Sequence, residues 1–342
     1  MYGIRGNVYD LFASYLTNRK QYTLINGVKS DYRSISCGIP QGSVLGPLLF
    51  LLYVNDINSV SKFKINLFAD DSYLSLNNHC PSQLQADMNT ELLKIDRWLK
   101  MNKLSLNIEK TFFILFTNRR INFDFAIKIG TTPLKRKSEV TYLGVQLDEK
   151  MSWNPHIHRI QRKLSSAVWA LSRLKNLLDQ KTKVAVYYGL IHSKLLYCIS
   201  CWGGVSSNKK KKLTSLQKRA MRIICNVEER SPSMPLFKEL KILNLDDTYK
   251  LQIASIMNKQ KQDEWRGNFA PTDIINLHNH WTRQANRQNY FVPAANIDIF
   301  KSSLSYNGPV VWRSVPDHMK RHTAVNFKKH YRDFLLKSYE AS

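Results

Sequence analysis

Two acidic residues stand side by side in a chain that is otherwise strongly basic. Asp70 and Asp71 lie in the stretch INLFADDSYLSL, residues 65–76, between two apolar runs typical of strands. Adjacent carboxylates repel each other, and each loses favourable hydration on burial unless a cation neutralises it. Hard oxygen ligands suit Mg²⁺, which takes only one or two protein carboxylates together with substrate phosphates. The pair therefore favours a metal site for phosphoryl transfer, and the plain alternative is an exposed acidic turn without a ligand.

The charge balance of the chain points to a polyanionic partner. Its 342 residues carry 51 Lys and Arg against 26 Asp and Glu, a net charge of +25, and 11% of them are aromatic. This excess favours nucleic acid, with a membrane surface as the second choice and a solvated basic surface as the simplest alternative. The run of lysines from Lys209 to Lys212 predicts a solvated loop, and a phosphate contact is its alternative.

The cysteines and the apolar runs indicate the compartment in which the chain is expected to lie. The five scattered cysteines do not form a disulfide framework, which indicates a reducing, intracellular compartment. Cys198 and Cys201 have C-x-x-C spacing, but no second Cys/His pair follows at zinc-finger spacing, so we expect no structural zinc. The longest apolar run, PLLFLLYV at 47–54, is too short to span a bilayer, and the first residues lack the features of a signal peptide.

The first part of the chain is predicted to mix hairpins and helices. Asn26-Gly27 lies between two strand-like runs and supplies the positive φ angles of a type I′ hairpin turn. The almost wholly apolar run at 47–54 predicts a helix that is buried on all sides. The other expected elements are helices at 7–17 and 82–104, strands at 111–116 and 140–148, and a hairpin around the acidic pair.

From Trp153 onward the pattern turns helical, which marks a domain change near residue 150. Three consecutive helices are expected before residue 230, and the following segment is richer in Pro, Asn and His and ends in a helical tail. We therefore divide the chain into an α+β part at 1–150, a helical part at 151–230 and a mostly helical extension at 231–342.

The order of the motifs supports a more specific interpretation. GIPQGSVLGPLLFLLYVNDI at 38–57, followed after a short gap by FADD at 68–71, closely resembles two neighbouring motifs of reverse transcriptases from non-LTR (LINE-type) retrotransposons. Downstream, WLKMNKLSLNIEKT resembles the family motif that ends in Asn-x-x-Lys-Thr, and YLGVQLDEKMSWNPHI resembles its primer grip and the beginning of the thumb. The stretch YNGPVVWRSVPDHMK is similar to the tail of the Jockey-like and chicken-repeat-like branches, so the resemblance covers most of the chain.

The resemblance implies a fold, an activity and partners. The fold would be an incomplete reverse-transcriptase palm at 1–150, a helical thumb at 151–230 and a C-terminal extension at 231–342. The implied activity is RNA-directed DNA polymerase, a nucleotidyltransferase that uses an RNA template, a DNA primer and deoxynucleoside triphosphates, with two Mg²⁺ ions or Mn²⁺ as cofactor. The family's chemistry at chromosomal DNA would place its site of action in the nucleus, without a membrane partner.

The resemblance also assigns roles to single residues. Asp70 would ligate the catalytic metal, Asp71 would assist it or shape the site, and Lys110 would protonate pyrophosphate, with an exposed lysine beside a strand as its alternative. The other implied residues are Phe68 and Ala69 at the primer end, Pro40, Gln41 and Gly42 near the template and the incoming nucleotide, and Tyr142, Leu143 and Gly144 in the primer grip. Their alternatives are a helix-entering turn without a ligand and an ordinary core hairpin.

Two histidines at the start of the helical part receive a different interpretation. His156 and His158 are two residues apart, so they cannot share one helix face as metal ligands do. We expect them at the surface or in contact with nucleic acid.

One part of the family pattern does not occur in these residues. The family carries a further catalytic Asp upstream of the Pro-Gln-Gly motif, in a strand with the pattern apolar-Asp-x-x-x-Ala-Phe-Asp. Asp10, in DLFASYL, is the only acidic residue among the first thirty and does not fit this pattern. We therefore expect the C-terminal portion of a reverse transcriptase with little or no activity alone. The alternatives are a catalytically dead nucleic-acid-binding remnant of such an element and an unrelated basic scaffold protein.

Overall fold

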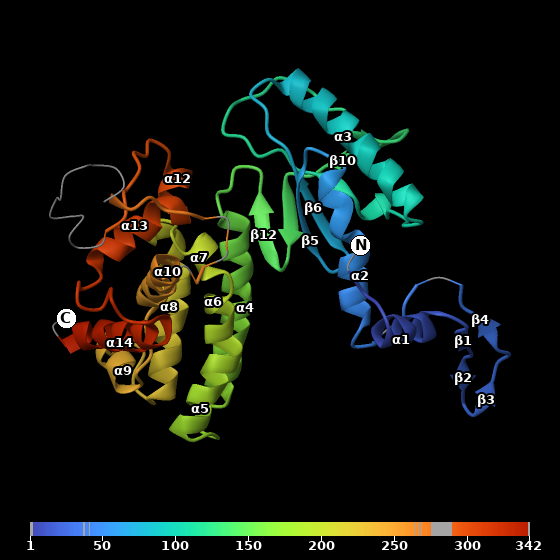
Figure 1. The fold of residues 1–342 in the computed structure, drawn as a ribbon. Helices are drawn as coiled ribbons and strands as arrows, with labels where there is room; N and C mark the ends of the chain where they lie inside the picture. Colours follow the sequence, from blue (N-terminus) through green and yellow to red (C-terminus); the bar gives the residue numbers. More distant parts are fainter. Residues whose placement is uncertain are drawn as a thin grey trace. The chain divides into compact units, whose positions relative to one another are not determined.

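A computed structural model describes residues 3–36, 38–40, 42–262, 264–265, 267, 269–274 and 289–340. The chain divides into two compact units, an N-terminal unit of residues 1–113 and 121–136 and a C-terminal unit of residues 114–120 and 137–342. Helices and short strand pairs together give an α+β chain (Figure 1). In the described part of the chain, no helix has the length and apolar content needed to cross a bilayer.

The N-terminal unit begins with a helix and a long, exposed hairpin. Helix α1 (Asn7–Leu16) precedes the strand pairs β1 (Lys20–Gln21) with β4 (Arg33–Ser34) and β2 (Leu24–Ile25) with β3 (Val28–Lys29). At the turn between β2 and β3, Asn26 and Gly27 have φ angles of 49° and 81°. These two positive angles confirm the hairpin predicted from the Asn-Gly pair.

Helix α2 (Gly46–Val54) corrects one expectation from the sequence. Only Gly46 and Val54 are buried, whereas Leu48, Leu51 and Tyr53 expose half of their surface or more. The prediction of a helix buried on all sides is therefore wrong. Apolar composition shows that a helix gains from burial, but it does not supply the elements that must cover each face. Tyr53 anchors the C-terminal end of α2, because its hydroxyl donates a hydrogen bond of 2.6 Å to the carbonyl of Asn102.

A two-stranded hairpin and a long helix form the rest of the core of this unit. The turn η1 (Asn55–Ser59) leads into β5 (Lys64–Phe68) and β6 (Asp71–Ser75), which are antiparallel, and then into α3 (Pro81–Met101). Helix α3 buries Leu92, Ile95 and Trp98 along one face, which confirms the predicted amphipathic helix. The buried carboxylate of Glu91 accepts a hydrogen bond from the amide of Lys62, so α3 also fixes the start of β5.

The last elements of the N-terminal unit are short strands. The turn η2 (Ile108–Lys110) precedes β7 (Phe112–Phe113), which pairs in parallel with β10 (Lys135–Arg136), and β8 (Lys128–Ile129) pairs with β9 (Thr132–Pro133). The strand predicted at 111–116 is therefore only two residues long.

The C-terminal unit starts with a hairpin and continues as a helical body. Its first elements are β11 (Glu139–Tyr142), β12 (Val145–Asp148), α4 (Asn154–Arg173), α5 (Gln180–Tyr187), the π-helical turn η3 (Tyr188–His192), α6 (Ser193–Leu196), α7 (Ile199–Trp202) and α8 (Ser207–Ile224). Of the three predicted helices, the first and the third form as expected, and the second is broken. Cys198, with a φ of 50°, lies at the break between α6 and α7. The division predicted at residue 150 falls inside this unit, between β12 and α4.

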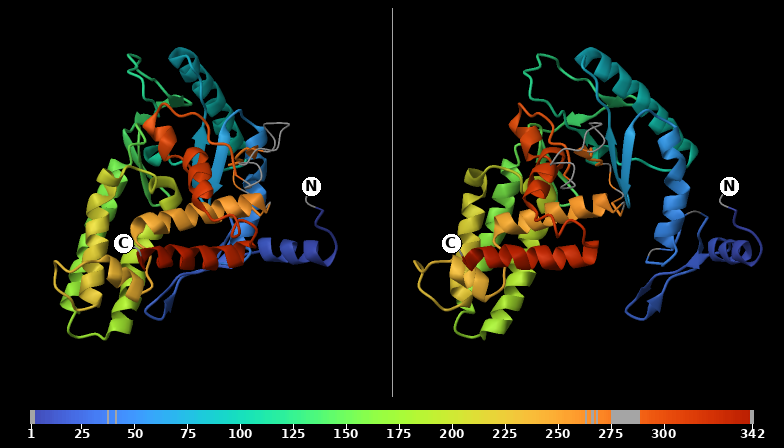
Figure 2. Two further views of the ribbon diagram at one scale, coloured as in Figure 1. Left: turned by 90° about the vertical axis from the view of Figure 1, so that its left-hand side faces the viewer. Right: turned by 60° about the vertical axis from the view of Figure 1, so that its left-hand side comes forward.

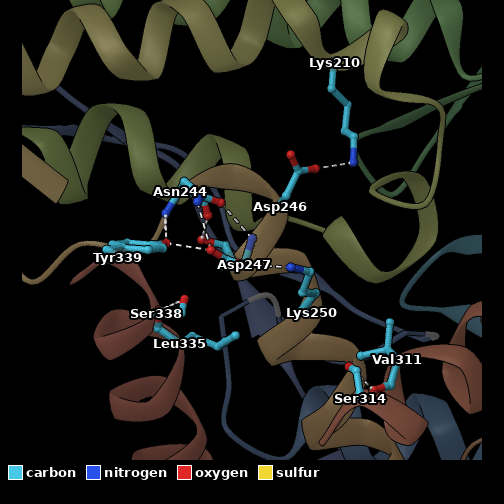
Figure 3. Close-up of polar contacts among 11 residues, drawn as sticks. Lys210, Asn244, Asp246, Asp247, Lys250, Val311, Ser314, Leu335, Ser338 and Tyr339 are labelled. Carbon is cyan, nitrogen blue, oxygen red and sulfur yellow. Dashed lines mark hydrogen bonds and ion pairs between the residues drawn. The ribbon is translucent and has the colours of Figure 1, made fainter. Parts of the chain in front are cut away.

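The remaining helices share a core with those before them. They are α9 (Met234–Glu239), α10 (Leu245–Lys261), α12 (Asp298–Ser302), α13 (Leu304–Ser314), α14 (Ala324–Lys337) and η5 (Ser338–Glu340). One hydrophobic cluster extends from Val145 to Tyr339 and joins residues of α4, α8, α10 and α14. Helices α10 and α14 lie side by side, as the orange and red ribbons of Figure 2 show. Polar contacts between α8, α10 and the C-terminal turn reinforce this packing (Figure 3).

Candidate active site and nucleic-acid interface

The acidic pair lies at the tip of the β5–β6 hairpin. Ala69 and Asp70 form the turn, with Ala69 in the left-handed region at a φ of 50°, and Asp71 begins β6 directly opposite Phe68. Residues opposite each other on antiparallel strands share a face, so Asp71 lies on the same face as Phe68. Both carboxylates are exposed, and Phe68 exposes 60% of its surface. The hairpin predicted around the acidic pair is therefore confirmed.

The environment of this tip suits a cation. Within the described part of the chain, neither Asp70 nor Asp71 forms an ion pair, so two neighbouring negative charges are available to a ligand. Two hard oxygen donors fit the few protein ligands that Mg²⁺ takes, with water and phosphate oxygens completing its shell. Over the same described residues, no cluster of three or more His, Cys, Asp or Glu side chains could hold a metal ion by itself.

The loop before α2 brings two of the three predicted template residues into a tight turn. Gln41 lies outside the described residues. The amide of Ser43 donates to the carbonyl of Pro40 at 3.3 Å, and the Ser43 hydroxyl accepts from the amide of Gly46 at 3.1 Å. Gly42 has a φ of 80°, a conformation that glycine adopts without strain, and nothing lies within 4 Å of where its Cβ would be. A ligand could therefore approach the backbone here closely.

Arg19 supports this loop and was missed from the sequence. Its Nη2 donates to the carbonyl of Gly38 at 2.5 Å, and its Nε donates to the carbonyl of Leu16 at 3.2 Å. The side chain thus ties the end of α1 to the residues just before the Pro-Gln-Gly turn. The bond to Gly38 spans 19 residues, so no local pattern predicts it.

Lys110 lies in the turn η2, and its side chain is exposed. The side-chain oxygen of Asn107 accepts from the amide of Lys110 at 3.1 Å, and the Asn107 carbonyl accepts from the hydroxyl of Thr111 at 2.8 Å. Asn107 therefore shapes the turn that carries Lys110. The signal was present in the sequence, because an Asn side chain commonly accepts a hydrogen bond from a backbone amide a few residues later. The role of Lys110 as a proton donor stays a prediction.

The residues assigned to the primer grip form the tight turn between β11 and β12. Tyr142 lies opposite Val145, and the turn residues Leu143 and Gly144 have φ angles of 45° and 79°. Tyr142 and Leu143 are half-buried. These residues belong to the C-terminal unit, whereas Asp70 and Lys110 belong to the N-terminal unit.

His156 is buried in the C-terminal unit, contrary to expectation. Its Nδ1 accepts a hydrogen bond of 3.3 Å from the amide of Gln146, and its Nε2 has no hydrogen-bond partner among the described residues. Burial, with Arg159 and Lys163 nearby, lowers the pKa of His156 from 6.5 to about 4. The prediction of a surface position is wrong for His156 and correct for His158, which is exposed. Spacing alone could not show that His156 faces Trp153 and Trp202.

The lysine run also differs from its prediction, because it lies in the first turns of α8 and not in a loop. Lys210 is buried, and its ammonium donates to Asp246 at 2.5 Å (Figure 3). It also donates to the carbonyl of Gly203 at 3.0 Å. Lys209 donates to the carbonyl of Ser152 at 2.7 Å. Half of the run therefore stabilises the C-terminal unit. Lys211 and Lys212 are exposed and make no such contact with the residues that the structure describes.

Helix α4 carries a basic surface without any acidic residue. Arg162, Lys163 and Arg173 are exposed, and Trp169 on the same helix exposes 62% of its surface. The guanidinium of Arg173 lies 5.2 Å from the centroid of the Trp169 ring. Exposed cations neutralise phosphates, and an exposed indole offers a flat surface on which a base or sugar can pack. We call residues Arg162, Lys163, Trp169 and Arg173 the α4 surface.

Comparison with known proteins defines the class. Residues 5–147 match the family described as reverse transcriptase (RNA-dependent DNA polymerase). This range contains the loop before α2, the β5–β6 hairpin, Lys110 and the β11–β12 turn. The match to the reverse transcriptase family over residues 5–147 confirms the resemblance seen in the motifs.

The chain is similar to proteins named as polymerases of mobile elements. It is 23% identical over 78% of its length to a probable RNA-directed DNA polymerase from transposon X-element of Drosophila melanogaster, covering 32% of that protein. It is 25% identical over 72% of its length to the RNA-directed DNA polymerase from mobile element jockey of the same species, covering 28%. A Pol polyprotein from the type-1 element R1 of Bradysia coprophila is 27% identical over 58% of this chain. The chain spans about a third of the length of the first of these relatives.

Proposed function

We propose that this chain carries part of the active site of an RNA-directed DNA polymerase that extends a DNA primer on an RNA template. The observation that carries the proposal is the position of Asp70 and Asp71, exposed and unpaired by any described cation, at the tip of a hairpin inside the matched family range. The proposed site joins the carboxylates to the exposed Phe68 beside the primer end and to the Pro40–Gly42 turn near the template and incoming nucleotide.

The residues of this chain then have distinct tasks. Asp70 holds a divalent ion, Mg²⁺ or Mn²⁺, and Asp71 assists it or orients the hairpin. Two such ions, when bound, activate the primer hydroxyl and stabilise the leaving pyrophosphate. Lys110 gives a proton to the pyrophosphate, and the turn at Tyr142, Leu143 and Gly144 supports the primer strand. We propose that the reaction takes place at chromosomal DNA, which would make the nucleus its site of action.

The α4 surface supports nucleic acid as the partner. It presents three cations and an exposed indole, and α4 contains no carboxylate that would repel phosphates. We assign residues 151–230 to the thumb that grips the template and primer. Because residues 231–342 share its hydrophobic cluster, we propose that the extension supports the thumb.

A second candidate is a nucleic-acid-binding remnant without catalysis. It is favoured by the α4 surface, which presents cations and an exposed indole to a nucleic acid without any catalytic group.

Primer extension on an RNA template with Mg²⁺ tests both candidates. The proteins are this chain, the chain preceded by a family-type strand with its Asp, and the latter carrying Asp70→Asn. Asp31→Asn, in the exposed hairpin of the N-terminal unit, is the control for loss of one negative charge. Extension by the strand-completed chain and its Asp31 variant, but not by its Asp70 variant, supports the polymerase. Duplex binding without extension by any of these proteins supports the remnant.

A further inference from the structure

Tyr197 contacts the β11–β12 turn from 54 residues away in the sequence, because its hydroxyl donates a hydrogen bond to the carbonyl oxygen of Leu143. We propose that Tyr197 is a positioning residue that fixes the orientation of this turn for binding of the primer end. The inference rests on the proposed function, which assigns the turn to the primer grip.

The turn itself leaves this carbonyl available. Leu143 and Gly144 connect two strands whose last cross-strand pair is Tyr142 with Val145, so the Leu143 carbonyl lies outside the ladder. The ring of Tyr197 also covers Gly144, since ring atoms lie 3.5 to 3.8 Å from where a Cβ on Gly144 would be. Hydroxyl and ring therefore hold both residues of the turn.

Tyr197 is itself fixed from the core of the helical body. Its carbonyl accepts a hydrogen bond of 3.0 Å from the indole nitrogen of Trp202, which is fully buried. The Trp202 ring lies 5.9 Å from the ring of His156, and His156 accepts from the amide of Gln146 in β12. These contacts therefore connect the turn with its own hairpin through the helical body. The connection begins at Leu143 and ends at Gln146, three residues later in the sequence.

The base of the same hairpin is held independently. The buried carboxylate of Asp148 accepts from the amides of Ser152 and Trp153 at 3.0 and 3.1 Å, where the chain enters α4. Arg159 of α4 donates to the hydroxyl of Thr141 in β11 at 3.4 Å. With its base fixed in this way, the hairpin keeps its place when Tyr197 is changed, and only the tip loses its restraint.

The hydroxyl, more than the ring, carries the proposed role. Tyr197 exposes 50% of its surface, so its ring contributes little to the core compared with Trp202 or Tyr187. Tyr197→Phe keeps the ring over Gly144 and removes the bond to Leu143, together with the hydroxyl's contact with the thiol of Cys198. Tyr188→Phe is the matched control, because Tyr188 is also partly exposed in the same unit and makes ring contacts with Tyr187 and His192.

The experiment compares two duplexes of equal length and charge, an RNA template with a recessed DNA primer 3′ end and a fully blunt RNA–DNA duplex. We measure the Kd of each for this chain and for the Tyr197→Phe and Tyr188→Phe variants, together with their thermal unfolding midpoints. We expect the native chain and Tyr188→Phe to prefer the recessed end. Tyr197→Phe should lose about fivefold in affinity for the recessed duplex, as for one hydrogen bond, and keep its affinity for the blunt duplex.

The outcomes separate this inference from the proposed function. If the native chain prefers the recessed end and Tyr197→Phe retains that preference, the positioning role is overturned while the proposed function stands. If Tyr197→Phe weakens binding of both duplexes equally and lowers the unfolding midpoint, the tyrosine is merely structural and the inference is again overturned. If the native chain binds neither duplex, the proposed function fails and the inference fails with it.

Discussion

The hydroxyl of Tyr339 donates a hydrogen bond of 2.7 Å to the buried carboxylate of Asp247, which lies 92 residues earlier in the chain (Figure 3). The same hydroxyl accepts from the amide of Asn244 at 3.1 Å, where α10 begins. Asn244 also caps α10, because its side-chain oxygen accepts from the amide of Asp247. The turn η5 therefore completes the N-terminal end of α10 in the C-terminal unit.

We predict that Tyr339→Phe lowers the free energy of unfolding by about 1–3 kcal/mol, because it leaves Asp247 and the Asn244 amide each short of a partner in a buried place. Urea unfolding followed by circular dichroism measures the change. Tyr188→Phe should change stability by less than about 0.5 kcal/mol, as for an exposed substitution. Equal losses in the two variants would mean that the network in Figure 3 adds nothing specific.

The lysines of α8 offer a second stability test. Lys210→Ala removes a buried cation from Asp246 and from the carbonyl of Gly203, and we expect a loss of about 3 kcal/mol. Lys211→Ala, at the neighbouring exposed position, should be nearly neutral. Chemical denaturation of both variants measures the change in the free energy of unfolding. If Lys210→Ala does not change this free energy, Lys210 has no structural role beyond that of a surface charge.

His156 makes stability depend on pH in a defined window. Its pKa is about 4 in the folded chain, against an ordinary value of 6.5, because burial disfavours the imidazolium. Between these values the unfolded chain binds the extra proton, so stability is complete above pH 6.5 and falls as the pH drops towards 4. We expect a loss of about 1–3 kcal/mol across this window.

The measurement for His156 is the unfolding free energy at several pH values between 7.5 and 4. His156→Asn should reduce the slope, whereas His158→Asn, at the exposed neighbour, should leave it unchanged. His192 is half-buried, and burial lowers its pKa, so part of the slope should persist in the His156 variant. An identical slope in the native chain and in His156→Asn would contradict the assignment.

Metal binding at the hairpin tip can be tested without turnover. Mn²⁺ is a paramagnetic substitute for Mg²⁺. When it binds to the exposed Asp70 and Asp71, it should broaden the signals of nearby amides in nuclear magnetic resonance spectra. We expect weak binding that Asp70→Asn reduces several-fold, since one of two oxygen-ligand groups loses its charge. Asp31→Asn should not change the titration. If Asp70→Asn leaves the broadening unchanged, the metal binds at another site.

The α4 surface predicts a specific pattern of nucleic-acid affinity. Trp169→Ala should weaken duplex binding by about 1–3 kcal/mol if the indole packs against the nucleic acid. Arg162→Gln should weaken binding of all sequences alike and lower the slope of log Kd against log salt by about one unit. Leu177→Ala, at a strongly exposed apolar position just after α4, is the control. Fluorescence anisotropy over a range of salt concentrations gives both quantities.

The sequence predicted correctly those elements that depend on residues close together in the chain. The Asn26-Gly27 turn, the hairpin around Asp70 and the long helices α3, α4 and α8 each depend on residues within a short window. The contacts that escaped prediction join distant segments, such as Lys210 with Asp246 and Arg19 with Gly38. Periodicity marks an apolar face, but it does not show which segment will cover that face or which polar side chain will be enclosed with it.

The candidate site shows the same division. The positions of Asp70, Lys110 and the β11–β12 turn follow from motifs whose order resembles one family. The residues that hold these groups in place were found only in the structure. Asn107 had a local signal that could have identified it, because a side-chain oxygen three residues before an amide is a common turn former. Tyr197 had none, since its partner lies 54 residues away and its own neighbourhood reads as an unbroken helix.

The β5–β6 hairpin has a consequence for the behaviour of this chain in solution. Among the described residues these strands pair only with each other, so each presents an outer edge that another strand could join. Such edges promote association between copies at high concentration, and charges near them oppose it. Lys64 begins the first strand and Asp71 begins the second, next to Asp70. The negative charges of Asp70 and Asp71, which we propose to hold metal, would therefore also keep the chain soluble. Replacing these aspartates by neutral residues should make the chain more prone to aggregate.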